Sequence, residues 1–105
     1  MSKNPYQRWF VNSHYSVAGR PKMEDELMNF AREKWMDCLV YETDIPRMVV
    51  VLKEKQEKIY AENKRLKKVE ISTSKYTTDG DCWLYLYIGA QHLCLRRVAK
   101  EIECI

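Results

Sequence analysis

Glycine and proline are scarce in this sequence, with three of each among 105 residues. Collagen-like and low-complexity chains depend on these residues, so both classes are excluded. Hydrophobic residues make up 46% of the chain and charged residues 31%, which argues against a wholly disordered chain. The length suits one domain with a modest core, and we expect a single domain over residues 1–105.

Long hydrophobic runs are missing as well. No stretch approaches the ~18 apolar residues of a membrane-spanning helix, and residues 1–10 lack the apolar core of a signal peptide. The cysteines at positions 38, 82, 94 and 104 form no C-x-x-C pair, so no zinc or redox motif is indicated. We therefore expect a cytoplasmic protein with free thiols, without membrane association, metal or cofactor.

Charge is unevenly distributed, although the net charge is only +3. Residues 1–22 carry four bases and no acid, residues 23–44 carry two bases and seven acids, and residues 45–105 carry twelve bases and eight acids. Basic segments at both ends suit a polyanionic partner, and ordinary surface charge is the equally weighted alternative.

Two helices are predicted within residues 21–67, after an N-terminal arm over residues 1–20. The first spans 22–40 with Pro21 near its first turn, and its apolar face holds Leu27, Met28, Ala31, Trp35, Cys38 and Leu39. The second spans 45–67 with Asp44 as N-cap. Its stripe of Ile45, Val49, Leu52, Ile59 and Leu66 is interrupted by Gln56 and Asn63, so we expect its far half to project into solvent.

Residues 68–105 change to a period of two, which predicts strands at 69–76, 82–88 and 91–98. Two-residue turns at Asp79–Gly80 and Gly89–Ala90 would join them into a meander. Both turns place the same aliphatic residues on one face, so the two registers support each other. The alternative is a terminal helix over residues 91–104.

The predicted fold class is therefore α+β, with two helices packed on one face of a three-stranded antiparallel meander. The N-terminal arm could supply a fourth strand, near residues 7–11 or 14–18. The aliphatic face of the sheet should meet the helices; it holds Ile71, Leu84, Leu86, Ile88, Leu93 and Leu95.

The opposite face is the candidate binding surface, because aromatic rings and arginine planes stack on nucleic-acid bases. Its members are Tyr76, Trp83, Tyr85, Tyr87, His92 and Arg96. Two alternatives stay open. The N-terminal arm could cover this face with Trp9 and Phe10, or a protein partner could occupy it.

A second candidate is the basic segment at the end of the second helix, where Lys64, Arg65, Lys67 and Lys68 could contact phosphates. A solvated helix face is the competing interpretation.

No catalytic motif accompanies these surfaces. A dyad of Cys94 and His92 would need an orienting group and an oxyanion donor, and no motif marks either. Asp79 and Asp81 fit a hairpin turn better than a calcium loop. We expect no enzymatic activity.

We therefore predict a small non-enzymatic protein that binds a nucleoprotein complex or its nucleic acid. In size, basic ends and lack of catalytic motifs, the chain resembles the small accessory proteins of phages and mobile elements, such as anti-CRISPR inhibitors. That resemblance implies inhibition by occupying a site. The alternative is a homo-oligomeric structural protein joined through the aromatic face or a seam of Leu52, Ile59 and Leu66.

Overall fold

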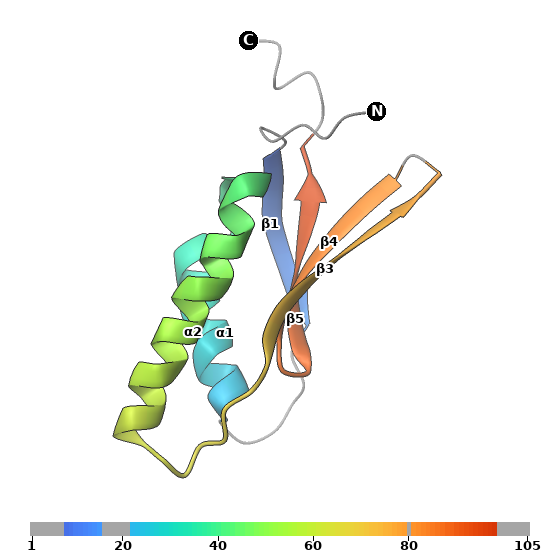
Figure 1. Cartoon of the computed structure of the whole chain (residues 1–105). Coiled ribbons are helices and arrows are strands. Elements are labelled where there is room, and N and C mark those ends of the chain that lie inside the picture. The colour runs from blue at the N-terminus through green and yellow to red at the C-terminus, as the bar shows by residue number, and fades with distance from the viewer. Residues whose placement is uncertain (1–7, 16–21, 80, 99–105) are drawn as a thin grey trace.

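A computed structural model of the chain describes residues 8–15, 22–79 and 81–98. In chain order the elements are β1 (Arg8–Tyr15), α1 (Met23–Trp35), β2 (Leu39–Tyr41), a short 3-10 turn (Glu42–Asp44), α2 (Ile45–Glu62), β3 (Ile71–Thr78), β4 (Asp81–Ile88) and β5 (Gln91–Arg97). Figure 1 shows both helices on one side of the sheet. The predicted α+β class is confirmed, as are the two helices packed on one face.

The sheet has five antiparallel strands in the order β2-β1-β5-β4-β3. The predicted meander is confirmed residue by residue: Tyr76 pairs with Trp83, and Trp83 pairs with Arg96. Gly89 has a φ of +63°, the positive value that the first residue of a type II′ turn requires. Residues 91–97 form a strand, so the alternative of a helix there is wrong.

The strand count is one higher than the four that the sequence allowed. β1 is the fourth strand that the N-terminal arm could supply, and β2 is a fifth that was not predicted. β1 pairs with β5 on one side and with β2 on the other, and a bulge between Val11 and Ser13 shifts its register. Trp9 and Val11 alternate with Phe10, and this short period-two pattern is what places β1 in the sheet.

The first helix is shorter than predicted, and the prediction that it includes Cys38 and Leu39 is wrong. It ends at Trp35, and Asp37 adopts a left-handed φ of 65° that an α-helix cannot accommodate. The Asp37 N–H donates to the Val11 carbonyl at 2.7 Å, and the Val11 N–H donates to the Cys38 carbonyl at 3.0 Å. These bonds direct residues 39–41 along β1 as a strand.

The second helix also ends earlier than predicted, at Glu62 rather than 67. Asn63 leaves the helix in extended geometry, with φ −144° and ψ 90°. Its side-chain oxygen accepts from the Arg65 N–H at 3.1 Å, the local bond by which asparagine favours turns. At the other end, Asp44 makes no side-chain cap for the helix, and its carboxylate accepts from the Tyr41 N–H instead.

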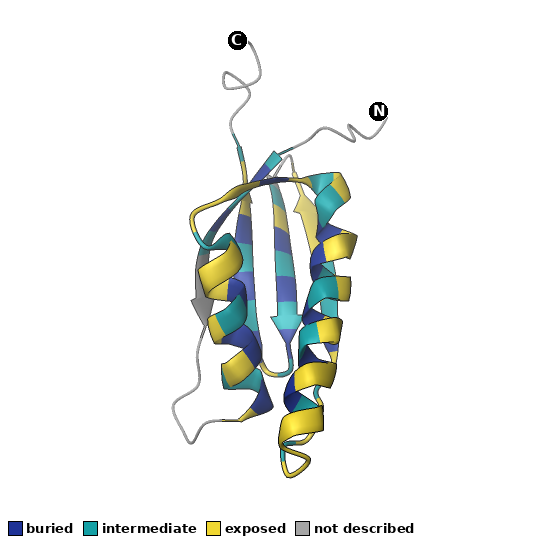
Figure 2. Ribbon diagram, turned by 90° about the vertical axis from the view of Figure 1, so that its left-hand side faces the viewer, coloured by how far each residue is buried: buried dark blue, intermediate teal, exposed yellow. Residues whose placement is uncertain are grey.

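The core lies between the helices and the face of the sheet that they cover, which we call the inner face (Figure 2). Trp9, Leu86, Ile88, Leu93 and Leu95 are fully buried there. Leu52 and Ile59 are buried in the same core and Leu66 packs against it, so the proposed seam between copies is wrong. No helix of the described part of the chain is long and apolar enough to cross a membrane.

The polar residue in the stripe of α2 has a specific partner. Gln56 is buried, and its side-chain oxygen accepts from the Val69 N–H at 2.6 Å. Since a buried N–H without a partner costs about 1–3 kcal/mol, Gln56 holds the start of β3 against α2.

Candidate binding surface on the outer face of the sheet

The face opposite the helices, which we call the outer face, is set by strand alternation. Every second residue of β3, β4 and β5 lies on the outer face, beginning with Ser72, Trp83 and His92. β1 and β2 extend it, because Phe10 pairs with Arg96 on one side and Leu39 on the other. The sheet therefore presents a five-strand surface, whereas three strands and a possible fourth were predicted.

Large side chains stay accessible on this face. Of the five exposed large hydrophobic residues among those described, only Val50 lies elsewhere, on α2. The other four, with their exposed fractions, are Leu39 (41%), Tyr41 (42%), Tyr76 (53%) and Trp83 (39%). Exposed apolar patches of this kind on a folded chain mark interaction surfaces.

Four rings on the outer face form one continuous group, which we call the aromatic cluster: Tyr76, Tyr85, Tyr87 and His92. Tyr85 is at its centre, with ring centroids 5.9 Å from Tyr76, 6.1 Å from Tyr87 and 5.3 Å from His92. The contacts to Tyr76 and His92 are edge-to-face, the arrangement that ring quadrupoles favour. The cluster therefore supports itself and keeps the rings in fixed orientations.

Two arginines lie on the same face, each over a ring. The Arg96 guanidinium carbon is 5.8 Å from the centroid of Phe10, and that of Arg8 is 5.0 Å from the centroid of Tyr41. No outer-face strand residue whose side chain the structure describes is Asp or Glu. The described part of this face is therefore aromatic and cationic.

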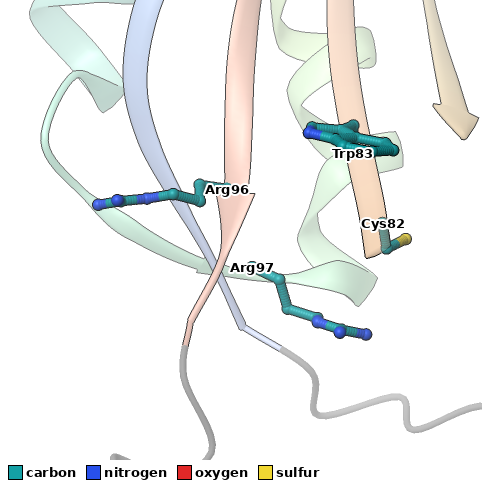
Figure 3. Close-up of a pocket in the computed structure, with 4 residues that line it drawn as sticks. All are labelled: Cys82, Trp83, Arg96 and Arg97. Carbon is teal, nitrogen blue, oxygen red and sulfur yellow. The ribbon is translucent and has the colours of Figure 1, made fainter. Parts of the chain in front are cut away.

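A notch of about 290 Å³ opens at one end of the sheet, between β4 and β5, and residues of both faces line it. Figure 1 shows the β3–β4 hairpin bending away from β5 at this end of the sheet. Trp83 lies across the notch, which is also lined by Cys82, Arg96 and Arg97 (Figure 3). The two arginine side chains extend to different sides, so the notch does not bring both guanidinium groups to one point.

The described part of the N-terminal arm, β1, does not cover this face with Trp9, as one alternative expected; residues 1–7 and 16–20 of the arm lie outside the described residues. Trp9 is fully buried on the inner face, and Phe10 is itself an outer-face residue of β1 that contacts Arg96. Both helices are on the inner side. Among residues 8–15, 22–79 and 81–98, no element lies over the aromatic cluster.

The basic segment is far from Trp83. Lys64, Arg65, Lys67 and Lys68 are all exposed in the connection between α2 and β3, not on a helix. Trp83 is beside the opposite end of β3, about 26 Å away at ~3.3 Å per residue. Lys68 is also engaged, with its ammonium 2.8 Å from Glu57 and 4.7 Å from the Tyr60 ring centroid. The structure therefore separates the basic segment from Trp83, whereas Tyr87, which pairs with Ser72, lies nearer to it.

Sequence reasoning missed the β1–β2 half of the outer face. Leu39 and Tyr41 belong to a three-residue strand, which is too short for a period-two test. The usable signal was Asp37, a residue type that tolerates the left-handed conformation that ends α1.

Metal binding finds no support in the described residues. No group of three or more His, Cys, Asp or Glu side chains there could hold an ion. Cys38, Cys82 and Cys94 are unpaired, and Cys104 lies outside the described residues.

Comparison with known proteins found no match to a protein family, to a curated protein or to a solved structure. The geometry of the outer face is therefore the basis for a functional proposal.

Proposed function

We propose that this protein binds single-stranded nucleic acid, free or within a nucleoprotein complex, on the outer face of its sheet. The observation that carries the proposal is one face, covered by none of the described elements, that combines the aromatic cluster, Trp83 and two arginines without a described carboxylate. Bases of any sequence stack on aromatic rings, and each stacked base contributes about 1–3 kcal/mol. Arginines beside the rings suit the phosphates that connect stacked bases.

The mode of action that we propose is occupancy without chemistry, as an inhibitor of phage or mobile-element character would work. The unpaired cysteines suit a reducing cytoplasm, and we include that location in the proposal. The basic segment, Lys64 to Lys68, is a secondary contact for a strand long enough to pass the end of the sheet.

The test is fluorescence anisotropy with labelled single-stranded RNA, single-stranded DNA and duplex DNA, at low and near-physiological salt. We expect binding to the single strands that weakens with salt. Trp83→Ala should weaken it roughly 5- to 150-fold, the equivalent of one stacked base.

Trp35→Ala is the matched control. Trp35 is a tryptophan on the other side of the molecule, partly buried and packed edge-to-face on Phe30 in the helix layer. We expect its affinity to stay near wild type, with circular dichroism used to verify folding of both variants. Absence of binding at low salt, or an equal loss in both variants, contradicts the proposal. If no binding is found at low salt, the expected partner of the outer face is a protein.

A further inference from the structure

β3 is an edge strand with an unusually open side. It is the last strand in the sheet order, so only β4 pairs with it among the described elements. Thr73, Lys75 and Thr77 on its inner-face side are exposed, so the helices do not cover it beyond Ile71. The opposite edge strand, β2, has only three residues. Long open edges are the places where a sheet accepts another strand.

Two hydrogen bonds define which backbone groups face the open edge. The Gly89 N–H donates to the Glu70 carbonyl at 2.9 Å, on the β4 side. The Val69 N–H instead donates to Gln56 in α2. Because backbone groups alternate in an antiparallel pair, Thr73, Lys75 and Thr77 also direct their N–H and C=O groups away from β4. No described group pairs with them there.

We propose that this edge pairs with β3 of a second copy of the chain, antiparallel about a two-fold axis at Ser74. This register opposes residue 71 with 77 and 73 with 75, and it uses nearly the whole strand. It also brings the N–H and C=O groups that point away from β4 in the two copies opposite each other. The neighbouring register, centred on Lys75, would place two lysines directly opposite, which is unfavourable.

Charge complementarity at the strand ends supports a second copy as the occupant. β3 runs from the basic segment at residues 64–68 to the turn that contains Asp79. In the register centred on Ser74, Val69 of one copy is opposite Asp79 of the other, and the exposed Lys67 is on the same face two residues further along, within reach of that aspartate. The two-fold axis repeats this contact at the other end of the pair.

Pairing in this way joins the two sheets into one sheet of ten strands, with both outer faces on the same side. This pairing does not cover the aromatic cluster, because the contact uses only the edge of β3. The inference is therefore independent of the proposed nucleic-acid binding, and either one can fail without the other.

Disulfide trapping tests the register. Ser74→Cys places one thiol from each copy at the two-fold axis, in a non-hydrogen-bonded pair with Cα atoms about 4.5 Å apart, within disulfide range. Ser72→Cys is the matched control, because it lies on the same strand and face. Its two copies would be offset by four residues, about 13 Å, which is beyond disulfide reach.

We expect mild oxidation with copper–phenanthroline to convert Ser74→Cys to a covalent dimer, while Ser72→Cys and wild type stay uncrosslinked on a non-reducing gel. Mass spectrometry of the linked peptide separates residue 74 from native cysteines. Equal crosslinking of both variants, or none of Ser74→Cys, overturns the register.

Sedimentation velocity tests the edge itself. Wild type should form a dimer that dissociates on dilution, and Thr73→Pro should shift it to monomer. The Thr73 N–H faces away from β4, so this proline leaves the β3–β4 ladder intact, and a thermal melt verifies folding. Lys67→Glu should weaken the dimer at low salt, because the new carboxylate of one copy would repel Asp79 of the other.

A wild-type monomer at all concentrations overturns the proposal, as does a dimer that Thr73→Pro leaves unchanged. If Tyr85→Ala dissociates the dimer and Thr73→Pro does not, copies join through the aromatic face instead. Nucleic-acid affinity, measured separately with Trp83→Ala, reports on the proposed function alone.

Discussion

Leu86 and Tyr85 are neighbours on β4, yet they serve opposite faces of the sheet. Leu86 is fully buried between the sheet and the helices, whereas Tyr85 is half-buried in the aromatic cluster on the outer face. The same alternation runs through β5, where Leu93 and Leu95 face inward and His92 faces outward. Because the strands are shared, the sequence can specify the fold with one set of positions and leave the other set available for binding.

The largest effect should come from the inner face. Leu86→Ala removes a fully buried side chain from the centre of the core, and we expect it to lower the free energy of unfolding by about 2–5 kcal/mol. Tyr85→Ala on the outer face should cost less, since it loses only part of its burial and its ring contacts. Urea denaturation measures both. Equal losses would contradict the division between the faces.

Gln56 tests whether the inner layer needs a polar contact. Gln56→Met keeps most of the volume but removes the acceptor for the Val69 N–H. We expect a loss of about 1–3 kcal/mol in urea denaturation, with faster amide hydrogen exchange at the start of β3. Gln56→Glu, which keeps an acceptor oxygen, is the control. An unchanged stability in Gln56→Met would remove this role for the side chain.

Arg96 tests whether an outer-face residue contributes to binding without contributing to stability. Arg96→Gln removes a charge that is exposed and that contacts Phe10. The stability should change by less than about 0.5 kcal/mol, because the site is on the surface. The salt dependence of oligonucleotide binding should become shallower by about one phosphate contact. A large loss of stability with unchanged binding would make Arg96 a structural residue.

A small effect on stability is also expected at the ion pair between Lys75 and Glu42, whose charged atoms are 2.6 Å apart. Glu42 also accepts from the Trp9 indole N–H at 3.3 Å. The lysine is more than one third exposed, so solvent screening limits the contribution of the pair to less than about 1 kcal/mol. Lys75→Met should therefore shift the thermal midpoint only slightly. A loss of several kcal/mol would show that this contact is part of the core.

The meander was predictable because two independent turns agreed on one division of residues. Asp79–Gly80 and Gly89–Ala90 each fix a register, and both assign Leu84 and Leu86 to the inner face. Boundaries set by a single residue were harder to predict. The first helix ends near Asp37 and the second at Asn63, although apolar residues continue at helical spacing in both cases.

The candidate site was predictable in its aromatic half, since Tyr76, Trp83 and Tyr85 follow from the meander register alone. Its β1–β2 half was not. The position of Phe10 and Tyr41 depends on backbone bonds between Val11 and the segment after α1, which join residues far apart in the sequence. Because this pairing joins distant segments, no local periodicity in the sequence predicts it.

The most direct test of the central claim is a titration of isotope-labelled protein with a short single-stranded oligonucleotide, followed by two-dimensional NMR of side-chain and backbone signals. We predict shifts concentrated on the rings of Tyr76, Trp83, Tyr85, Tyr87 and His92 and on the Arg96 guanidinium. The methyl groups of Leu86, Leu93 and Leu95 should move little. Shifts confined to the helices, or none at low salt, would contradict the assignment of the outer face as the binding surface.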